Sequence, residues 1–510
     1  MPRSFVSIRW TARIGVTFAI ALAIGPGVAR GQAKEEPIPP PREATRDGQP
    51  DAELRRRLEP LVPSIRAALQ GNSPDAQRAA LAVIADFPPG LLFQANLSGP
   101  IAAFLLKEHK DPDLVAFGLR SFGKSYPESP EVVTKVLGRH AKSENVEVRR
   151  AVGDALASVV QTLAPAGRSV ANATAFIDMA KAVLPLLGEL LEDKDAVTQK
   201  ATMGGVQTVA RVVVELYTFD TGPIGEEPKK EDDEKRFAPL APVLKGLADV
   251  VPKLAAPLGS PDPDTRTAAA RTAEYLAGVR RVVMSPPAAG AKPAADPFAD
   301  RWGSLRAVTA ERMKDPDPAV RLAVTEALEG MGDALPVKAL LREATMDRSV
   351  FVRWAAARAL GKGAPAKPDP AAVADDVAAL ARLVADADID VRMAALNALA
   401  RYGPAARPGA AVVLVAAGRG DIEPRVVAVR TLGALESEHS ETVPVLIEAL
   451  RDPDVRLRRA AASGLVRFGP DARPALPYLR RALSDPDQDL RIAAAEAILA
   501  IERPARLKDL

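Results

Sequence analysis

The sequence contains no cysteine among its 510 residues. This absence excludes disulfide bonds, zinc sites built on thiolates, covalently attached c-type haem and thiol nucleophiles. Aromatic residues make up only 4% of the chain. So few aromatic side chains argue against a β-sandwich and favour helices that pack closely through small residues. An all-α fold is therefore expected.

The chain also lacks a large excess of charge, with 68 basic and 65 acidic residues and a net charge of +3. A sum this small gives no long-range field that would draw the whole chain onto nucleic acid. Hydrophobic residues account for 47%, which is enough for an ample core, but 510 residues exceed what one compact domain usually holds. We expect repeats or several domains, and no nucleic-acid partner.

Residues 1–33 have the pattern of a secretory signal peptide. Three arginines precede an apolar run over residues 14–24, which is too short to span a bilayer. Small residues follow, and cleavage after Ala33 or Ala29 fits the requirements of the signal peptidase. The pattern predicts an exported protein, periplasmic or extracellular, with no transmembrane segment in the mature chain. An uncleaved N-terminal anchor is the alternative.

The rest of the chain divides into three parts. Residues 34–50 hold five prolines among charged side chains, a composition that favours a flexible linker. Residues 51–300 show irregular amphipathic helical repeats with two loop insertions, at residues 218–239 and 285–300. Residues 301–510 show regular repeats.

A repeat of about 33 residues is clearest near the C-terminus. The segments 443–465 and 476–498 match at most of their apolar and turn positions when shifted by 33 residues. One arginine recurs in each unit, and leucine or isoleucine follows it seven positions later. Positions three and seven after the arginine share one helix face, so that face is expected to be buried. The recurring arginines are Arg321, Arg353, Arg392, Arg425, Arg458 and Arg491.

An Asp-Pro-Asp turn, then Val-Arg or Leu-Arg, then an alanine-rich helix ending in leucine resembles the HEAT repeat, in the short bacterial form also found in phycobilin lyases. The resemblance implies a HEAT-type solenoid, a right-handed superhelix of helix pairs, over the whole mature chain. It is strict from Asp315 onward and looser before. The recurring arginine position of the earlier units is assigned to Arg78, Phe117, Arg149, Gln199 and Arg266.

The resemblance also implies that turn acids and the arginines six residues later form a ladder between neighbouring repeats. A separation of six residues does not put two side chains on the same helix face, so pairing within one helix is not expected. We interpret the ladder as structural, holding the stacking register. Its expected members are Asp315, Arg321, Asp347, Arg353, Asp386, Arg392, Asp452, Arg458, Asp485 and Arg491.

No catalytic, cofactor or metal site is recognisable in the sequence. Acids between Asp485 and Glu496 match several positions of a calcium-binding loop, but Leu490 stands where that loop needs glycine. The three histidines are far apart, and the sequence has no phosphate-binding loop or nucleophile elbow. The Arg-Gly-Asp triplet at 419–421 is interpreted as an ordinary turn. We therefore expect a protein that is not an enzyme.

Two classes of function remain. The first is a scaffold that binds a protein or peptide along the extended surface of the solenoid. The alternative, based on the resemblance to phycobilin lyases, is a lyase-like or chaperone-like repeat protein that acts on a partner protein. No pigment-binding motif supports the alternative.

The partner surface is expected on the second helix of each regular repeat. At about 100° per residue, the positions one, five and nine after the recurring arginine point away from the core. These positions predict a binding site made of Trp354, Arg358, Met393, Arg401 and Arg430, on the inner curve by resemblance to HEAT proteins. Such a surface suits an acidic, partly apolar partner. Alternatively, the two apolar side chains are buried between repeats and the arginines are solvated.

Overall fold

The computed structural model describes residues 56–502 except 57, 86, 88–91, 93–94, 126, 128, 165–169, 171–172, 220–236, 285–295, 300, 332–335 and 437. The expected signal peptide and linker lie outside the described residues, as do most of the two loop insertions. The described part of the chain is helical and has no strand, as the sequence predicts.

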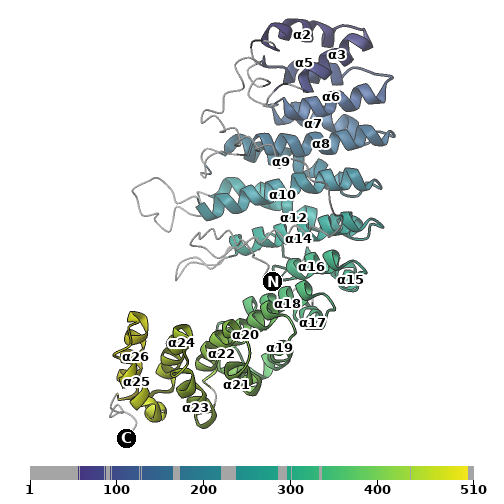
Figure 1. Ribbon diagram of the computed structural model, residues 1–510. Helices are drawn as coiled ribbons and strands as arrows, with labels where there is room; N and C mark the ends of the chain where they lie inside the picture. The colour runs from purple at the N-terminus through teal and green to yellow at the C-terminus, as the bar shows by residue number, and fades with distance from the viewer. Residues whose placement is uncertain are drawn as a thin grey trace, which may run out of the picture. The chain divides into compact units, whose positions relative to one another are not determined.

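The helices follow one another as pairs (Figure 1). The first helices are α2 (Val62–Gln70), α5 (Ser98–Leu105), α7 (Pro130–Ala141), α9 (Thr174–Leu190), α12 (Ala241–Val250) with α13 (Ala255–Leu258), α15 (Arg306–Arg312), α17 (Val337–Ala344), α19 (Pro370–Leu383), α21 (Ala410–Gly418), α23 (His439–Ala449) and α25 (Leu476–Ala482).

The second helices are α3 (Pro74–Ala85), α6 (Pro112–Lys124), α8 (Val146–Thr162), α10 (Ala196–Phe219), α14 (Pro263–Val283), α16 (Pro318–Leu328), α18 (Val350–Lys362), α20 (Ile389–Tyr402), α22 (Ile422–Leu435), α24 (Val455–Leu465) and α26 (Gln488–Ile501). Short 3-10 helices join some of them, at Glu59–Leu61, Ala238–Leu240, Val251–Leu254, Trp302–Leu305, Gly403–Gly409 and Val466–Ala475.

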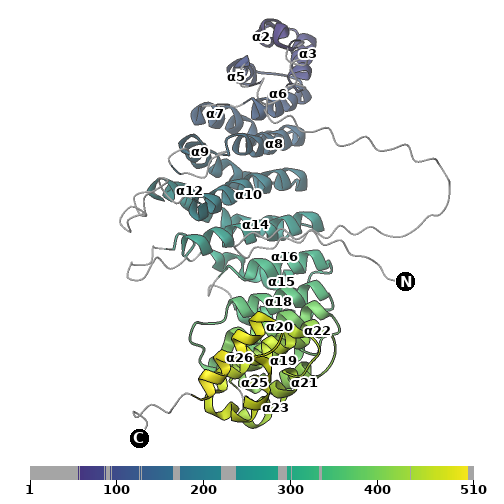
Figure 2. The same cartoon turned by 60° about the vertical axis from the view of Figure 1, so that its left-hand side comes forward.

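Each pair packs mainly on its neighbours in the sequence. From α6 to α26, each second helix contacts the second helix of the next pair, and most second helices also contact their own first helix. The first helices form a parallel series of contacts, for example between α7 and α9 and between α17 and α19. Figure 2 shows the same succession from another side. Two layers that grow by nearest-neighbour contacts are the architecture of a helical solenoid.

The turns before the second helices explain where these helices begin. Asp317 is the N-cap of α16, and its side chain accepts a hydrogen bond from the backbone N–H of Ala319 at 2.8 Å. Pro318 follows at the first helical position, where a missing N–H costs no hydrogen bond. Asp262 and Pro263 do the same for α14. The Asp-Pro pattern of the turns therefore marks the start of both helices.

Small residues let the second helices approach closely. Ala395 and Leu399, at positions three and seven after Arg392, are both fully buried. Gly433 of α22 lies directly against Gly464 of α24, where an added Cβ would meet the Gly464 Cα at 2.9 Å. The alanine-rich, aromatic-poor composition therefore serves the tight stacking of neighbouring repeats.

Candidate functional site

Arginines of the second helices reach carboxylates of the next repeat. Arg321 Nε donates to Asp347 Oδ2 at 2.7 Å, and its Nη1 donates to the backbone oxygen of Asp315, six residues earlier, at 2.7 Å. Each arginine of this kind therefore contacts both the turn of its own repeat and the turn of the next repeat. We call this set of ion pairs the first ladder. Equivalent ion pairs join Arg149 to Asp193, Arg266 to Asp315, Arg353 to Asp386, Arg425 to Asp452 and Arg458 to Asp485.

One cross-repeat pair of the first ladder differs from the expected pattern. Arg392 Nη2 lies 2.8 Å from Asp421 Oδ2, in the triplet interpreted as an ordinary turn. Asp421 is four residues before Arg425, because Arg419 occupies the usual acid position. The last arginine, Arg491, donates from Nη1 to the backbone oxygen of Asp485 in its own repeat at 2.8 Å.

Two of the early assignments were wrong in register. The backbone N–H of each ladder arginine donates to the backbone oxygen of the N-cap residue, four positions earlier. The N–H groups of Gln77 and Val115 donate in the same way to the backbone oxygens of Ser73 and Asp111. Gln77 and Val115 therefore hold the positions assigned to Arg78 and Phe117. Gln77 Nε2 also donates to the backbone oxygen of Gly71, six residues earlier, at 2.8 Å. Arg78 directly follows Gln77, and the sequence pattern assigned the repeat position to Arg78 because it is an arginine.

The residue directly after the ladder position forms a second row of ion pairs, which we call the second ladder. Arg150 Nη2 lies 2.7 Å from Asp195 Oδ1, and Lys200 Nζ lies 3.2 Å from Asp262 Oδ2. Arg78 pairs in the same way with Asp111, the N-cap of α6, and Arg459 pairs with Asp487, the N-cap of α26. The Arg459 guanidinium holds the pKa of Asp487 at about 2, below its usual value.

The second ladder is absent on α6 and α14, which have Ala116 and Thr267 at this position, and along the whole stretch from α16 to α22. There the same position carries Leu322, Trp354, Met393 and Val426 in place of a base. A cavity of about 520 Å³ opens between α16 and α18, and another of about 320 Å³ opens between α18 and α20. We call them the α16–α18 cavity and the α18–α20 cavity. Leu322 lines the first of these cavities, and Trp354 and Met393 line the second.

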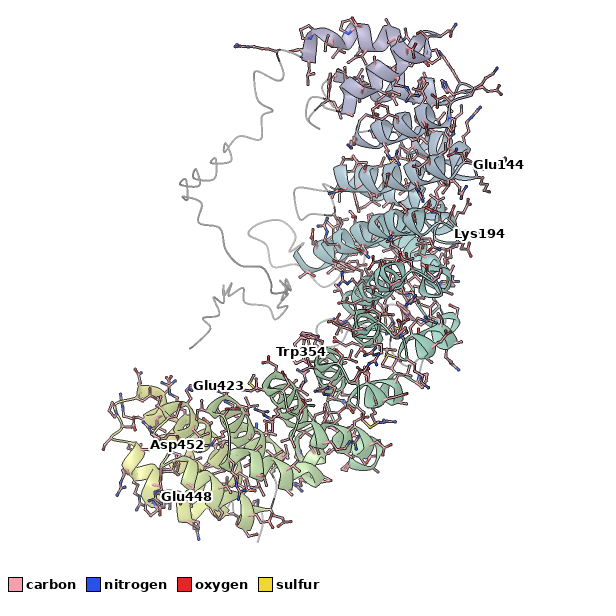
Figure 3. All side chains as sticks on the ribbon, turned by 45° about the vertical axis from the view of Figure 1, so that its right-hand side comes forward. Glu144, Lys194, Trp354, Glu423, Glu448 and Asp452 are labelled. Carbon is pink, nitrogen blue, oxygen red and sulfur yellow. The ribbon has the colours of Figure 1, made fainter. Side chains whose placement is uncertain are left out.

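The α18–α20 cavity unites most of the predicted binding residues. Trp354 and Arg358 enter from α18, and Met393 and Arg401 enter from α20, while Arg430 on α22 is not among the lining residues. Trp354 and Met393 are half-buried. They are therefore neither fully exposed on a binding surface nor fully buried between repeats, the two alternatives considered from the sequence. Figure 3 shows the position of Trp354 in the helical stack. The other lining residues are Gly361, Lys362, Asp390, Ala394, Asn397 and Ala398.

The cations of the α18–α20 cavity differ in their partners. The Arg358 guanidinium lies 4.3 Å from the centre of the Trp354 ring, a cation–π arrangement. Lys362 Nζ lies 2.8 Å from Glu329 Oε1 on α16. Among the ion pairs of the described residues, none involves Arg358 or Arg401. Two guanidinium groups are thus available to an anionic ligand.

A group of carboxylates on α14 and α16 borders this cation-rich surface. Burial raises the pKa of Glu274 to about 7, and the charges of Glu326 and Glu329 add to the effect. Burial also raises the pKa of Glu326. Glu329 pairs with Lys362 and, at 3.4 Å, with Arg281. This group could not be predicted from the sequence, because its members meet only when the two helices stack.

A second site missed from the sequence is a buried network between first helices. Asp376 of α19 is fully buried, and its carboxylate lies 2.8 Å from Arg342 Nη1 and 3.2 Å from Lys338 Nζ, both on α17. The Tyr402 hydroxyl lies 3.2 Å from Asp376 Oδ2. Burial raises the pKa of Tyr402, and the nearby Asp376 charge adds to this shift. Asp376 and Tyr402 are fully buried, whereas the Lys338 and Arg342 side chains are 44% and 30% exposed. We interpret the network as a structural one that stabilises the contact between α17 and α19.

Two further observations concern the described ranges only. No helix there is long and apolar enough to cross a membrane. The same ranges contain no group of three or more histidine, aspartate or glutamate side chains that could hold a metal ion.

The two layers of helix pairs define the chain as an all-α helical solenoid. Residues 305–375 and 410–500 match the HEAT repeat family, in the part of the chain where the turn and arginine pattern is most regular. No curated protein matches the chain. The particular resemblance to phycobilin lyases stays a prediction.

Two solved structures are among those similar to the chain. A crystal structure of an engineered protein is similar over 79% of this chain and 98% of its own, with 20% identity and a TM-score of 0.50. The karyopherin Kap121p bound to Nup53p is similar over 87% of this chain and 49% of its own, with 13% identity and a TM-score of 0.36. The chain thus spans about half the length of the karyopherin. The first of these similarities supports the solenoid fold.

Proposed function

We propose that this protein is an exported scaffold that binds an acidic, partly apolar protein segment in the α18–α20 cavity. The observation that carries the proposal is the meeting of Trp354, Arg358, Met393 and Arg401 in one cavity, from two neighbouring repeats. Solenoids of this kind offer long surfaces to which each repeat contributes a few contacts. The protein is proposed to act by binding rather than by catalysis.

The lining residues suit side chains of a partner segment. Stacking on Trp354 orients the Arg358 guanidinium, so less side-chain entropy is lost when it binds a carboxylate. Arg401 provides a second planar donor, and the Met393 thioether provides an adaptable apolar surface. A volume of about 320 Å³ lies at the small end of ligand cavities, which favours one or two side chains over a cofactor.

Charges at the edge of the cavity limit what can bind. Asp390 lines the same cavity and repels an anionic ligand from its side of the opening. Lys362 is already engaged by Glu329, so its contribution is smaller than that of the two arginines. We therefore expect the acidic residue of the partner to lie between Arg358 and Arg401.

The binding proposal can be tested with a phage-displayed library of random peptides. The chain should enrich peptides rich in aspartate and glutamate, and a folded variant with Trp354, Arg358, Arg401 and Arg430 all changed to alanine should not. A matched control changes three exposed arginines elsewhere, Arg382, Arg473 and Arg481, to alanine. Equal enrichment of the same peptides by the folded quadruple variant would refute the proposed surface.

Export is proposed on the basis of the N-terminal pattern alone. N-terminal sequencing of the protein isolated from its own cells, after separation of the envelope from the cytoplasm, tests it. We expect a first residue at Lys34 or Arg30 and recovery outside the cytoplasm. Recovery of a chain that starts at Met1 in the cytoplasm would contradict export and leave the binding proposal unaffected.

A further inference from the structure

We propose that the α16–α18 cavity is a second subsite, which receives a large apolar side chain of the same partner segment. This inference rests on the proposed function. It specifies the partner as an extended segment in which an apolar residue and an acidic residue are separated by about three to five positions.

The origin of the cavity lies in the interrupted second ladder. Arg459 Nε donates to Asp487 Oδ1 at 2.6 Å and closes the gap between α24 and α26. At the equivalent positions of α16 and α18 the chain has Leu322 and Ser349, which cannot form such a bridge. The α16–α18 cavity is therefore the space that a bridging base and its carboxylate fill elsewhere.

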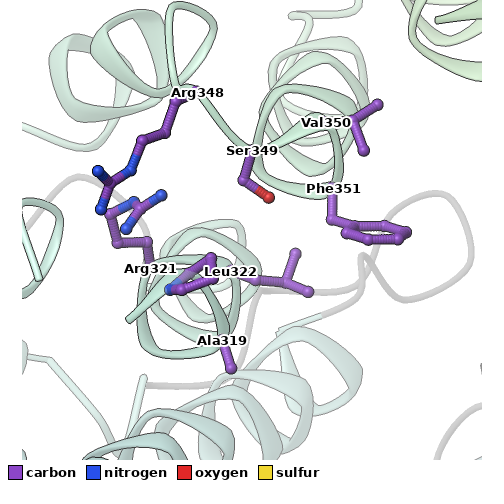
Figure 4. A pocket seen from close by; sticks show the side chains of 8 residues that line it. Ala319, Arg321, Leu322, Arg348, Ser349, Val350 and Phe351 are labelled. Carbon is purple, nitrogen blue, oxygen red and sulfur yellow. The ribbon is translucent and has the colours of Figure 1, made fainter. Parts of the chain in front are cut away.

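The lining of this cavity is mainly apolar. Leu322 is half-buried, and Phe351 has 61% of its surface exposed, which is high for a phenylalanine. Figure 4 shows the Leu322 and Phe351 side chains on one side of the cavity, with the two arginines on the other. Pro318, Ala319 and Val350 complete the apolar part of the lining. An apolar side chain that entered this space would remove Phe351 from water.

The polar groups of the cavity favour an acidic segment over a basic one. Arg321 is occupied by Asp347 in the first ladder. Arg348 Nη2 donates to the backbone oxygen of Pro316 at 3.0 Å, and none of the ion pairs of the described residues involves Arg348. The rim therefore carries the same sign of charge as the α18–α20 cavity. A second copy of this surface would place like charges against each other, so an acidic peptide is the better occupant.

The geometry of α18 sets the spacing between the two subsites. Phe351 and Trp354 are three residues apart and share a helix face. With a rise of about 1.5 Å per residue, Phe351 and Arg358 are separated by about 10 Å along the helix axis, and Phe351 and Lys362 by about 16 Å. An extended peptide covers about 3.3 Å per residue, so it bridges these distances with about three to five residues.

Binding of labelled synthetic peptides, measured by fluorescence anisotropy, tests the inference. The parent peptide is a glycine–serine chain with one leucine and two glutamates three and four positions away, made in both orders. Replacing the leucine by serine should weaken binding about tenfold, because the burial of one large apolar side chain is lost. Placing the leucine next to the glutamates should cost a similar factor. Replacing the glutamates by glutamines should also weaken binding, which tests the proposed function separately.

A variant that restores the missing bridge gives the sharpest comparison. Leu322→Arg combined with Ser349→Asp copies the pair Arg459 and Asp487, and it should fill the α16–α18 cavity while the repeats stay stacked. We expect this variant to lose the preference for the leucine peptide over the serine peptide. Its dependence on the glutamates should remain. The exposed substitution Phe351→Ser, which removes no buried side chain, provides the same test if the double variant does not fold.

The outcomes separate the inference from the proposal on which it rests. The subsite is overturned if the folded bridge-restoring variant still prefers the leucine peptide. It is also overturned if the affinity does not depend on the spacing between the leucine and the glutamates. If glutamate and glutamine peptides bind equally and Arg358→Ala has no effect, the proposed function itself fails. Light scattering tests whether a second copy of the chain occupies the cavity. If the parent protein self-associates, the bridge-restoring variant does not, and neither prefers the leucine peptide, the occupant is a second copy and the inference is overturned.

Discussion

Arg321 of α16 and Asp347 of the next repeat form an ion pair that is almost withdrawn from water. Their side chains are 5% and 12% exposed, and Nε lies 2.7 Å from Oδ2. The equivalent pair of Arg392 and Asp421 is much more open, since its aspartate is 62% exposed. The same position in the repeat therefore faces two very different dielectric surroundings.

This difference predicts unequal costs for the same substitution. Arg321→Ala leaves a nearly buried carboxylate without its partner and should lower the free energy of unfolding by about 3 kcal/mol. Arg392→Ala removes a partly solvated pair and should cost about 1 kcal/mol or less. Urea denaturation followed by circular dichroism measures both. Equal losses would show that burial does not control the strength of the first ladder.

Much of the fold follows from local patterns in the sequence. The period near 33 residues and the turn chemistry of Asp317 and Pro318 depend on neighbours along the chain, so they are readable without a structure. The second ladder was missed, because its pairs join residues about 28 to 62 positions apart at offsets that vary with loop length. The shared helix face of Trp354 and Arg358 could be predicted, because helical periodicity alone decides which positions leave the core. The cavity that these residues line could not, because it depends on how α18 and α20 stack.

The fully buried carboxylate of Asp376 provides a second prediction. Asp376→Asn keeps the size of the side chain but removes the anionic partner of Lys338 and Arg342, which are 44% and 30% exposed and stay partly solvated, so it should cost about 1 to 2 kcal/mol. Tyr402→Phe removes only one hydroxyl and should cost about 1 kcal/mol. The double variant should lose less than the sum of the two, since both act on one network. Strict additivity in urea denaturation would contradict a shared network.

The carboxylate of Glu274 predicts a pH dependence of stability. Its pKa is about 7 in the folded protein, raised from an ordinary value of 4.5 by burial and by the charges of Glu326 and Glu329. A raised pKa means that its stabilising contribution is complete below pH 4.5 and is lost as the pH rises through 7. Glu274→Gln should therefore raise the free energy of unfolding by about 2 kcal/mol at pH 8 and change it little at pH 4.5.

Thermal unfolding of the parent and Glu274→Gln between pH 4.5 and pH 8 checks this expectation. Glu496→Gln, an exposed position on α26, is the matched control and should leave the profile unchanged. A gain for Glu274→Gln that is equal at both ends of the range would rule out titration as its cause. The gain would then reflect packing of the neutral side chain alone.

Glycines of the second helices give a final set of predictions. In Gly433→Ala the new Cβ would lie 2.9 Å from the Gly464 Cα, which belongs to a backbone that cannot move aside. We expect this substitution to force α22 and α24 apart and to destabilise their contact by about 1 to 3 kcal/mol. In Gly278→Ala on α14, nothing lies within 4 Å of the new Cβ. That variant should gain about 0.5 to 1 kcal/mol from better helix propensity.

The opposing glycine makes the comparison sharper. In Gly464→Ala the nearest atoms belong to the Leu446 side chain, at 3.6 Å, which is ordinary van der Waals contact. The two glycines touch each other, yet only Gly433 should resist substitution, because the direction of its Cβ leads into the neighbouring backbone. Amide hydrogen exchange resolves the effect repeat by repeat, which suits a solenoid whose unfolding need not be two-state. We expect Gly433→Ala to lower the exchange protection of α22 and α24 and Gly464→Ala to leave it unchanged. The reverse order would show that Gly433 does not set the spacing of these two helices.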